Sequence, residues 1–275
     1  MNNVIFNVNV IKSKSNETVM EISKLSNKKY RAQKKLFLCD GIKLFTEAVK
    51  FGAKIKYIVL DNNVSFSNEL LEMVEGCVKK GAKILCVEEY VFVKMTSESS
   101  PQGIIAVCEF LEHKHRFFAN VENDYIKDKR IMILESVRDP GNMGAIFRNA
   151  VALGIDRLII SSDCVDIYSP KVVRASMGAF FKIDVDIVDD LVLTINKIKG
   201  FGRRVLAAAL KERSLILGKH PLSCSDVVVL GNEGHGIDSK TIEACTDTIF
   251  IPMRENTESL NVAIASAIIM WEISK

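Results

Sequence analysis

Residues 131–153 read IMILESVRDPGNMGAIFRNAVAL, and this stretch decides the fold. It opens with four apolar residues, as does a strand that is buried on both faces of a parallel sheet, and the predicted strand is Ile131–Glu135. A polar turn with proline and glycine follows. Apolar residues then return at helical spacing from Asn142 to Leu153. A buried strand that leads through a turn into a helix is the repeating unit of α/β folds with a parallel sheet.

The rest of the second half repeats this alternation. The further predicted strands are Arg157–Ser161, Lys182–Val188, Arg204–Ala209, Val227–Leu230 and Thr248–Ile251. The further predicted helices are Asp190–Ile198, Ser239–Ala244 and Glu258–Ile273. Several of these strands are apolar on both faces, which again favours a parallel sheet.

The first half alternates in the same way over about 110 residues and predicts a smaller α/β domain. Its predicted strands are Leu36–Cys39, Ile55–Leu60, Lys83–Val87 and Gly103–Glu109, and its predicted helices are Ile42–Phe51 and Asn68–Lys80. Gly52 and Gly81 follow the two helices, as helix-ending glycines commonly do.

A segment without sustained periodicity separates the halves. We therefore expect a first domain over 1–110, a linker over 111–129 and a second domain over 130–275. His113 and His115 lie in this linker, and without a nearby carboxylate cage they are read as solvated rather than as metal ligands.

Composition and targeting signals are those of a cytoplasmic globular protein. Apolar residues make up 48% of the chain and charged residues 26%. The seven cysteines are odd in number and show no C-x-x-C spacing, which indicates thiols in a reducing compartment. The N-terminus lacks the pattern of a signal peptide, and no run of 18 apolar residues predicts a membrane span.

Positive charge is concentrated in the first half. Residues 1–130 hold 21 Lys or Arg against 16 Asp or Glu, whereas residues 131–275 hold 16 against 18. The densest stretch, Lys24–Lys56, carries ten basic residues against Asp40 and Glu47. Such a stretch suits contacts with phosphates, although lysine-rich helix faces also serve solubility alone.

Three polar, glycine-containing loops follow predicted strands of the second half, at the sheet edge where α/β proteins bind ligands. They are Asp139–Arg148 (DPGNMGAIFR), Leu230–Ile237 (LGNEGHGI) and Ile251–Asn261 (IPMRENTESLN). The glycines of the second loop are in the wrong order for a dinucleotide fingerprint, and neither a P-loop nor an H-E-x-x-H motif occurs. Each loop alone is equally compatible with a structural turn.

Together, the three loops resemble in order, spacing and position the signature motifs of the SpoU/TrmH-type RNA 2′-O-methyltransferases of the SPOUT superfamily. The segments Lys28–Arg31, Leu36–Gly41 and Pro101–Gly103 resemble the substrate-binding domain that precedes many of these enzymes and is similar to a small ribosomal RNA-binding protein. The third loop departs from the family pattern, because Arg254, Glu255, Asn256 and Thr257 occupy a stretch that often holds a glycine.

This resemblance implies an α/β catalytic domain whose last two loops form a deep trefoil knot around S-adenosyl-L-methionine, with no metal. The residues that it places around the cofactor are Leu230, Gly231, Asn232, Ile251, Met253, Ser259 and Leu260. Gly231 is expected to let the backbone approach the cofactor closely.

The catalytic residues implied by the resemblance are Asn142, Arg148, Glu233 and Asn261. The family match gives Arg148 the task of helping the hydroxyl to lose its proton. Because arginine stays protonated, we favour a guanidinium that grips the adjacent phosphate and stabilises the developing alkoxide. Asn142 and Glu233 would orient Arg148 or the ribose.

The expected substrate is a ribose 2′-hydroxyl of ribosomal RNA, with transfer RNA second and an antibiotic-resistance methyltransferase as a narrower variant. Phosphate contacts are expected from Lys28, Lys29, Arg31, Lys34 and Lys35. The rival interpretations are a non-catalytic RNA-binding protein and a small-molecule methyltransferase. The former gives no reason for the four catalytic residues, and the latter leaves the basic first domain unexplained.

A homodimer is also expected, because family members pair through the catalytic domain. The predicted C-terminal helix is apolar or small nearly all round, which indicates burial on most of its sides. Burial inside the monomer would also explain this pattern.

Overall fold

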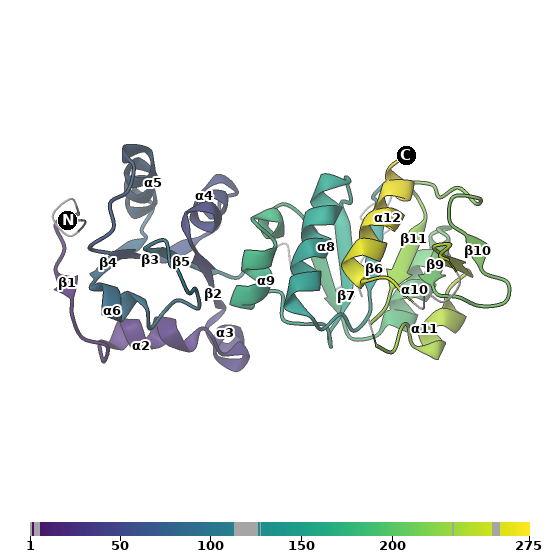
Figure 1. Ribbon diagram of the computed structural model, residues 1–275, viewed down its shortest axis with the longest axis horizontal. Coiled ribbons are helices and arrows are strands. Elements are labelled where there is room, and N and C mark those ends of the chain that lie inside the picture. Colours follow the sequence, from purple (N-terminus) through teal and green to yellow (C-terminus); the bar gives the residue numbers. More distant parts are fainter. Residues whose placement is uncertain (1, 3–5, 113–125, 127, 233, 255–258) are drawn as a thin grey trace. The chain divides into compact units, whose positions relative to one another are not determined.

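The computed structural model describes residues 2, 6–112, 126, 128–232, 234–254 and 259–275. It divides into two compact units (Figure 1). Unit 1 comprises Met1–Leu111 together with Asp166–Phe181, and unit 2 comprises Glu112–Val165 together with Lys182–Lys275. Most of the expected linker, residues 113–125 and 127, lies outside the described residues. No helix in the described ranges has the length and apolar character needed to cross a membrane.

Unit 1 holds a mixed five-stranded sheet in the order β1-β4-β3-β5-β2. Its strands are β1 (Val10–Ile11), β2 (Leu36–Asp40), β3 (Ile55–Asp61), β4 (Lys83–Val87) and β5 (Ile104–Glu109). Its helices are α2 (Glu17–Lys24), α3 (Lys28–Lys34), α4 (Ile42–Lys50), α5 (Asn68–Lys79), α6 (Glu89–Phe92) and α9 (Pro170–Ala175). Strand β5 runs antiparallel to both β2 and β3, so the sheet is not purely parallel.

Helix α9 belongs by sequence to the second half but packs in unit 1. Tyr168, just before it, stacks on Phe110 with ring centroids 3.7 Å apart and also packs against Phe37. Residues 166–181, which were expected to lie in the second domain over 130–275, therefore belong to unit 1. Buried aromatic side chains of this kind contribute strongly to the stability of the fold. A local sequence pattern does not reveal such packing between residues far apart in the chain.

Unit 2 holds an all-parallel seven-stranded sheet in the order β10-β12-β9-β11-β6-β7-β8. Its strands are β6 (Ile131–Leu134), β7 (Arg157–Ser161), β8 (Asp184–Val188), β9 (Val205–Ala208), β10 (Leu215–Ile216), β11 (Val227–Leu230) and β12 (Asp247–Phe250). Its helices are α8 (Pro140–Ala152), α10 (Leu191–Gly200), α11 (Ser239–Ala244) and α12 (Val262–Ser274). The α/β architecture with a parallel second sheet is confirmed.

The sheet of unit 2 is buried between helices on its two faces. Ile131 and Ile133 of β6 pack with Ile195 and Ile198 of α10 in one core cluster. Helices α8 and α12 lie side by side on the other face (Figure 1). Burial on both faces accounts for the continuous apolar strands.

Candidate active site

The three polar loops meet at one edge of the unit 2 sheet. Strand β11 pairs in parallel with β6 and β9, and β12 pairs in parallel with β9, so their carboxyl ends share that edge. Side-chain hydrogen bonds join the residues directly after β6 to the segment after β11. The Asn232 amide donates to the Ser136 carbonyl over 2.8 Å, and Asp238 N–H donates to the Glu135 carboxylate over 3.0 Å. The loop after β11 is thus held at both of its ends by consecutive residues after β6.

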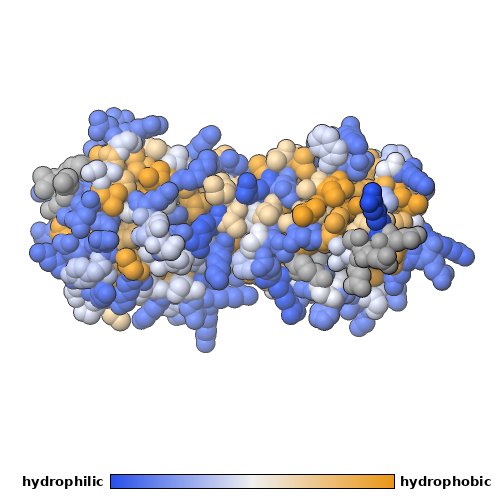
Figure 2. All heavy atoms as spheres, viewed as in Figure 1, coloured by the Kyte–Doolittle hydropathy of each residue, from blue (hydrophilic) through white to orange (hydrophobic). Residues whose placement is uncertain are grey.

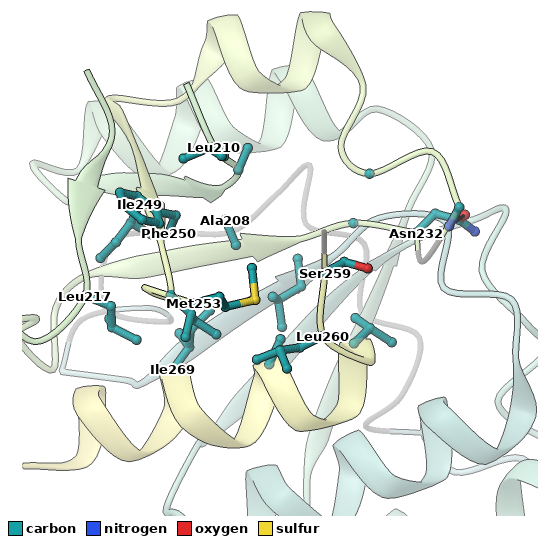
Figure 3. A pocket seen from close by; sticks show the side chains of 18 residues that line it. Ala208, Leu210, Leu217, Asn232, Ile249, Phe250, Met253, Ser259, Leu260 and Ile269 are labelled. Carbon is teal, nitrogen blue, oxygen red and sulfur yellow. Dashed lines mark hydrogen bonds between the residues drawn. The ribbon is translucent and has the colours of Figure 1, made fainter. Parts of the chain in front are cut away.

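A cavity of about 540 Å³ lies between the last two loops, β9, β12 and α12 (Figure 3). This volume is within the range of small-ligand pockets. All seven residues expected to contact the cofactor line it: Leu230, Gly231, Asn232, Ile251, Met253, Ser259 and Leu260. Among its described lining residues, only Asn232 and Ser259 carry hydrogen-bonding side chains. The Ser259 hydroxyl points toward the end of the cavity where Asn232 lies (Figure 3).

Gly231 is required by the protein's own loop. A Cβ atom at this position would lie 2.4 Å from the Gly236 carbonyl carbon and oxygen and 2.6 Å from an Ile237 side-chain carbon. Asn232 and Gly236 exchange backbone hydrogen bonds of 3.0 and 2.9 Å that close this loop. The loop therefore requires the glycine for a close approach of backbone to backbone, and the expected close approach to a cofactor stays a prediction.

Two of the four expected catalytic residues are in contact. The Asn261 amide donates to the Asn142 side-chain oxygen over 2.9 Å. Asn261 also caps α12, because its oxygen accepts from Ala263 N–H and Ile264 N–H. Asp139 caps α8 by accepting from Asn142 N–H over 2.7 Å. The two helices that carry the first and third loops thus begin beside each other.

Helices α8 and α12 are also linked two turns further along α8. The Asn149 amide donates to the Ala263 carbonyl over 2.8 Å and lies 3.2 Å from the Ser266 hydroxyl. Asn149 and Ser266 were not expected from the sequence. The buried Ser266 in an otherwise apolar helix was the available signal, because a buried hydroxyl needs a partner.

Arg148 stands apart from the cavity. It lies on α8, is exposed, and forms no hydrogen bond or ion pair within the part of the chain that the structure describes. It does not line the cavity, so the structure does not bring it to the cofactor-binding residues. Its planar group is therefore available to a ligand outside the cavity. Glu233, the fourth expected residue, lies outside the described residues, as do Glu255, Asn256 and Thr257.

Glu135 is a functional residue that the sequence reasoning missed. Its side chain is only 9% exposed, and besides Asp238 N–H it accepts the Thr241 hydroxyl over 2.6 Å. A buried carboxylate needs such partners. The signal was present, because Glu135 is the one charged residue at the end of an otherwise apolar strand. The cavity wall from Ala208 to Leu210 and Leu217 was also not expected.

The residues present fit a nucleoside-containing cofactor. Apolar side chains from two strands and one helix can clasp the faces of a planar ring, while Asn232 and Ser259 offer polar atoms at one end. Within the described ranges, no group of three or more histidine, cysteine or carboxylate side chains is placed to hold a metal ion.

The basic face expected to bind RNA lies on unit 1 around α3. Lys28, Lys29, Lys34 and Lys35 are exposed. Lys34 donates a hydrogen bond to the Glu21 carboxylate over 2.9 Å, and this bond raises the pKa of Lys34. Lys35 lies over the Phe110 ring, 5.7 Å from its centroid. Exposed cations of this kind can contact phosphates.

The prediction that Arg31 contacts a phosphate is wrong. It is 2% exposed, and its guanidinium donates to Asp166 over 2.5 and 3.1 Å and to the carbonyls of Leu25 and Ser26 over 2.7 and 2.8 Å. All of these partners belong to unit 1. The arginine is therefore a structural residue that ties α2 and α3 to the segment before α9.

Comparison with known proteins agrees with this geometry. The model of the SpoU rRNA Methylase family matches residues 129–271, and that of the MRM3-like substrate binding domain matches residues 16–106. The chain is 28% identical to the Bacillus subtilis 23S rRNA (guanosine(2553)-2′-O)-methyltransferase RlmP, over 96% of this chain and 98% of that protein. It is 24% identical to a 23S rRNA (uridine(2479)-2′-O)-methyltransferase of Streptomyces viridochromogenes, over 90% of this chain and 85% of that protein.

A solved structure gives the same result. The AdoMet-bound rRNA methyltransferase from Sinorhizobium meliloti superposes with a TM-score of 0.83 at 27% identity and covers 96% of each chain. The sheet order, the three converging loops and the family match over residues 129–271 therefore lead to one conclusion. The chain belongs to the SpoU rRNA methylase family.

Proposed function

We propose that this rRNA 2′-O-ribose methyltransferase modifies a nucleotide of 23S rRNA. The observation that carries the proposal is the place of the Asn142–Asn261 hydrogen bond next to the cavity between the last two loops, because Leu260 and Val262, on either side of Asn261, line that cavity. Support for 23S rRNA comes from the full-length similarity to enzymes that are named for that substrate. One of these is named for a guanosine and the other for a uridine, so the proposal extends to the ribose and not to the base.

The cofactor proposed for the cavity is S-adenosyl-L-methionine. When bound, it supplies a methyl group on a positively charged sulfur, which needs no metal to be transferred. Leu230, Ile251, Met253 and Leu260 contribute the apolar walls that hold the adenine ring. Asn232 and Ser259 offer hydrogen bonds at the end of the cavity nearest to the first loop.

Catalysis on the protein side is proposed to rest on positioning and charge. Arg148 grips the phosphate beside the target ribose and stabilises negative charge on the 2′-oxygen as the proton of this hydroxyl passes to water. The Asn142–Asn261 hydrogen bond fixes the start of α8 relative to α12 and orients the ribose. Glu233 is proposed to assist this orientation.

RNA is proposed to be positioned by the exposed lysines of unit 1. Lys28 and Lys29 form no ion pair within the described ranges, and Lys34 and Lys35 are held only by exposed contacts. Such cations give affinity and register, while the loops of unit 2 select the reacting ribose. An rRNA substrate also favours a cytoplasmic location.

The active enzyme is proposed to be a homodimer. On α12, Ile264 is 55% exposed and Trp271 is 56% exposed, and Ile268 lies between them at helical spacing. Figure 2 shows apolar side chains gathered over α8 and α12 on this face. A contiguous apolar patch of this kind typically marks an interface. Pairing here would bring the exposed Arg148 of α8 close to a second subunit.

The deep trefoil knot is proposed for the last two loops. Both loops line a single cavity, and β12 lies between β10 and β9 before the chain returns to pack α12 beside α8.

Transfer of tritium from labelled S-adenosyl-L-methionine tests the proposal. Unmodified transcripts of 23S rRNA, 16S rRNA and bulk tRNA serve as parallel acceptors, with EDTA present in a second set. We expect transfer to 23S rRNA alone, at a single ribose that becomes resistant to alkaline cleavage, and equal rates with and without EDTA. Transfer to tRNA instead would favour the second substrate class. Loss of transfer in EDTA would contradict metal-free chemistry, and absence of transfer to any RNA would contradict the function.

A further inference from the structure

A polar network beside the first loop has no part in the mechanism above. It lies at the carboxyl ends of β6 and β7, which pair in parallel. The Ser136 hydroxyl donates to the Asp163 carboxylate over 2.5 Å, and the Ser161 hydroxyl donates to the other carboxylate oxygen over 2.6 Å. Ser136 N–H donates in turn to the Ser161 hydroxyl over 2.9 Å. Three side chains from two loops are thus bonded into one unit.

Ser136 occupies a backbone conformation that it would not adopt without this support. Its φ is +54°, in the left-handed region that residues with a Cβ atom rarely enter. Its N–H, hydroxyl and carbonyl are all hydrogen-bonded, the last to the Asn232 amide. A sparsely populated conformation persists where surrounding bonds determine it, and such positions gather at functional sites. The network therefore sets the direction of the chain as it enters residues 137–139.

That direction fixes the place of Arg138. This residue directly precedes Asp139, the cap of α8, and its side chain is 69% exposed. Within the described ranges, its one side-chain contact is a 3.5 Å approach to the same Asp163 carboxylate. An exposed pair at this distance is weak, because solvent screens it and its geometry is poor. Arg138 therefore keeps most of its donors available to a ligand.

Asp163 is suited to hold a cation loosely. Burial alone would raise its pKa, but the hydrogen bonds from Ser136 and Ser161 and the charge of Arg138 together lower the pKa below its usual value. The carboxylate thus stays ionised at neutral pH. Two of its strong contacts go to hydroxyls, so it can release Arg138 to a phosphate without becoming an unpartnered charge.

We propose that Arg138 binds a phosphate of the RNA substrate, and that Asp163, through Ser136 and Ser161, is the positioning residue that aims it. The bonds run from Arg138 through Asp163 and Ser136 to Asn232, which lines the cavity. The phosphate contact is therefore placed in register with the cofactor pocket. Arg138 adds a second guanidinium to that of Arg148, which lies ten residues further along the chain on α8. This inference rests on the proposed RNA substrate.

The test uses the full chain and an unmodified 23S rRNA transcript. The variants are Arg138→Ala, Asp163→Asn and the double variant. Lys129→Ala is the control, because Lys129 is an exposed cation at the opposite, amino end of β6. The measurements are KM for RNA, kcat, the dependence of RNA affinity on salt, and the Kd of S-adenosylhomocysteine.

Arg138→Ala should raise KM for RNA about fivefold to tenfold, because solvent screens this exposed contact and reduces its contribution to that of an ordinary hydrogen bond. The slope of log affinity against log salt should become shallower by about 0.7 to 0.9, the value expected when one phosphate is no longer neutralised. Neither kcat nor the Kd of S-adenosylhomocysteine should change more than about twofold. Asp163→Asn should raise KM about threefold alone but have little further effect in the Arg138→Ala background, because the two residues act as one.

Two results would overturn this inference. One is a KM and a salt slope for Arg138→Ala that equal those of Lys129→Ala. The other is an effect of Asp163→Asn that is the same with and without Arg138, because that would be a structural effect on the loop. Both differ from failure of the proposed function, in which the wild-type protein itself would transfer no methyl group to the transcript and would overturn the RNA contact with it.

Discussion

Asn142 and Asn261 show how single side chains connect the helix starts of this fold to its site. Each belongs to a helix that leaves the carboxyl edge of the sheet, and one hydrogen bond of 2.9 Å joins them. The Asn261 oxygen accepts from two backbone N–H groups of α12, which leaves its amide to bind Asn142. One residue type thus satisfies a helix end and sets the distance between two loops.

Arg148 has the opposite character, since nothing in the described chain holds its guanidinium. Both Arg148→Lys and Arg148→Ala should lower the single-turnover rate of methyl transfer on the order of 100- to 1,000-fold, because the planar group is required as well as the charge. Calorimetry should give an unchanged Kd for S-adenosylhomocysteine, because Arg148 does not line the cavity. Transfer by the lysine variant within about threefold of wild type would show that the planar group is not needed.

Glu135 stabilises the loop after β11, which lines the cavity. Glu135→Ala leaves Asp238 N–H and the Thr241 hydroxyl without their acceptor, so the free energy of unfolding should fall by about 2 to 3 kcal/mol. The Kd for S-adenosylhomocysteine should rise with it, because the loop from Gly231 to Asp238 loses one of its two attachments. Thr241→Val is the matched control, which removes one hydroxyl and leaves Asp238 N–H bonded. A Glu135→Ala protein that binds the analogue as tightly as wild type does would contradict this support role.

Among the elements, those that a continuous apolar run or a clear helix start defines were predictable, and the two-residue strands were not. Strand β4 and helix α11 have the predicted bounds, because continuous apolar runs and a clear helix start define them. Strands β1 and β10 contain two residues each, too few for any period to appear. Helix α2 carries a strong apolar face, but it reaches into the lysine-rich stretch, where charge is the most visible feature of the sequence.

The same limit applies to the site. The residues expected around the cofactor all line the cavity, because they follow predicted strands in the order of a known motif set. Arg31 was not, because its partner Asp166 is 135 residues away in sequence. A lysine-rich helix shows which charges are present, but only tertiary packing shows which of them are buried. The assignment of residues 166–181 to unit 1 could not be predicted either, because it depends on contacts between residues that are far apart in the sequence.

Helix α3 with its flanking Lys35 should account for the salt dependence of RNA binding. Replacing Lys28, Lys29, Lys34 and Lys35 by alanine should weaken RNA affinity and make its salt slope shallower, by up to about 0.7 to 0.9 for each phosphate that is no longer neutralised. Filter binding at salt concentrations from about 50 to about 200 mM measures this. Lys79→Ala with Lys80→Ala at the end of α5 is the control and should change little. An unaltered slope in the four-lysine variant would rule this face out.

Arg31→Ala should behave differently from the four lysines. It would leave Asp166 mostly buried without its partner, so the free energy of unfolding should fall by about 3 kcal/mol. Thermal unfolding measures that change. At temperatures where the variant stays folded, the salt slope of RNA binding should equal that of wild type. A shallower slope with normal stability would instead restore Arg31 as a phosphate contact.

On the scale of the whole molecule, positive charge is concentrated in the first half of the chain. The basic excess lies in residues 1–130, whereas residues 131–275 are slightly acidic overall and expose an apolar stripe on α12. A substrate polyanion is attracted mainly to the first region. The second region can form hydrophobic contacts with another copy of the chain. Two strongly basic surfaces would instead repel each other.

The stripe on α12 leads to the prediction about assembly. Light scattering at micromolar protein should give about twice the 30.7 kDa mass of one chain. Trp271→Glu with Ile264→Glu should shift the protein to monomer, because two carboxylates would have to be buried without partners at the interface. Leu193→Glu is the matched control, since Leu193 is 63% exposed on α10, which covers the opposite face of the sheet. That variant should remain a dimer.

If the dimer brings Arg148 to a neighbouring subunit, the monomeric variant should lose methyl transfer while S-adenosylhomocysteine still enters its cavity. A wild-type protein that scatters as a single chain at every concentration tested would refute the dimer, and a fully active monomeric variant would show that each chain builds its site alone.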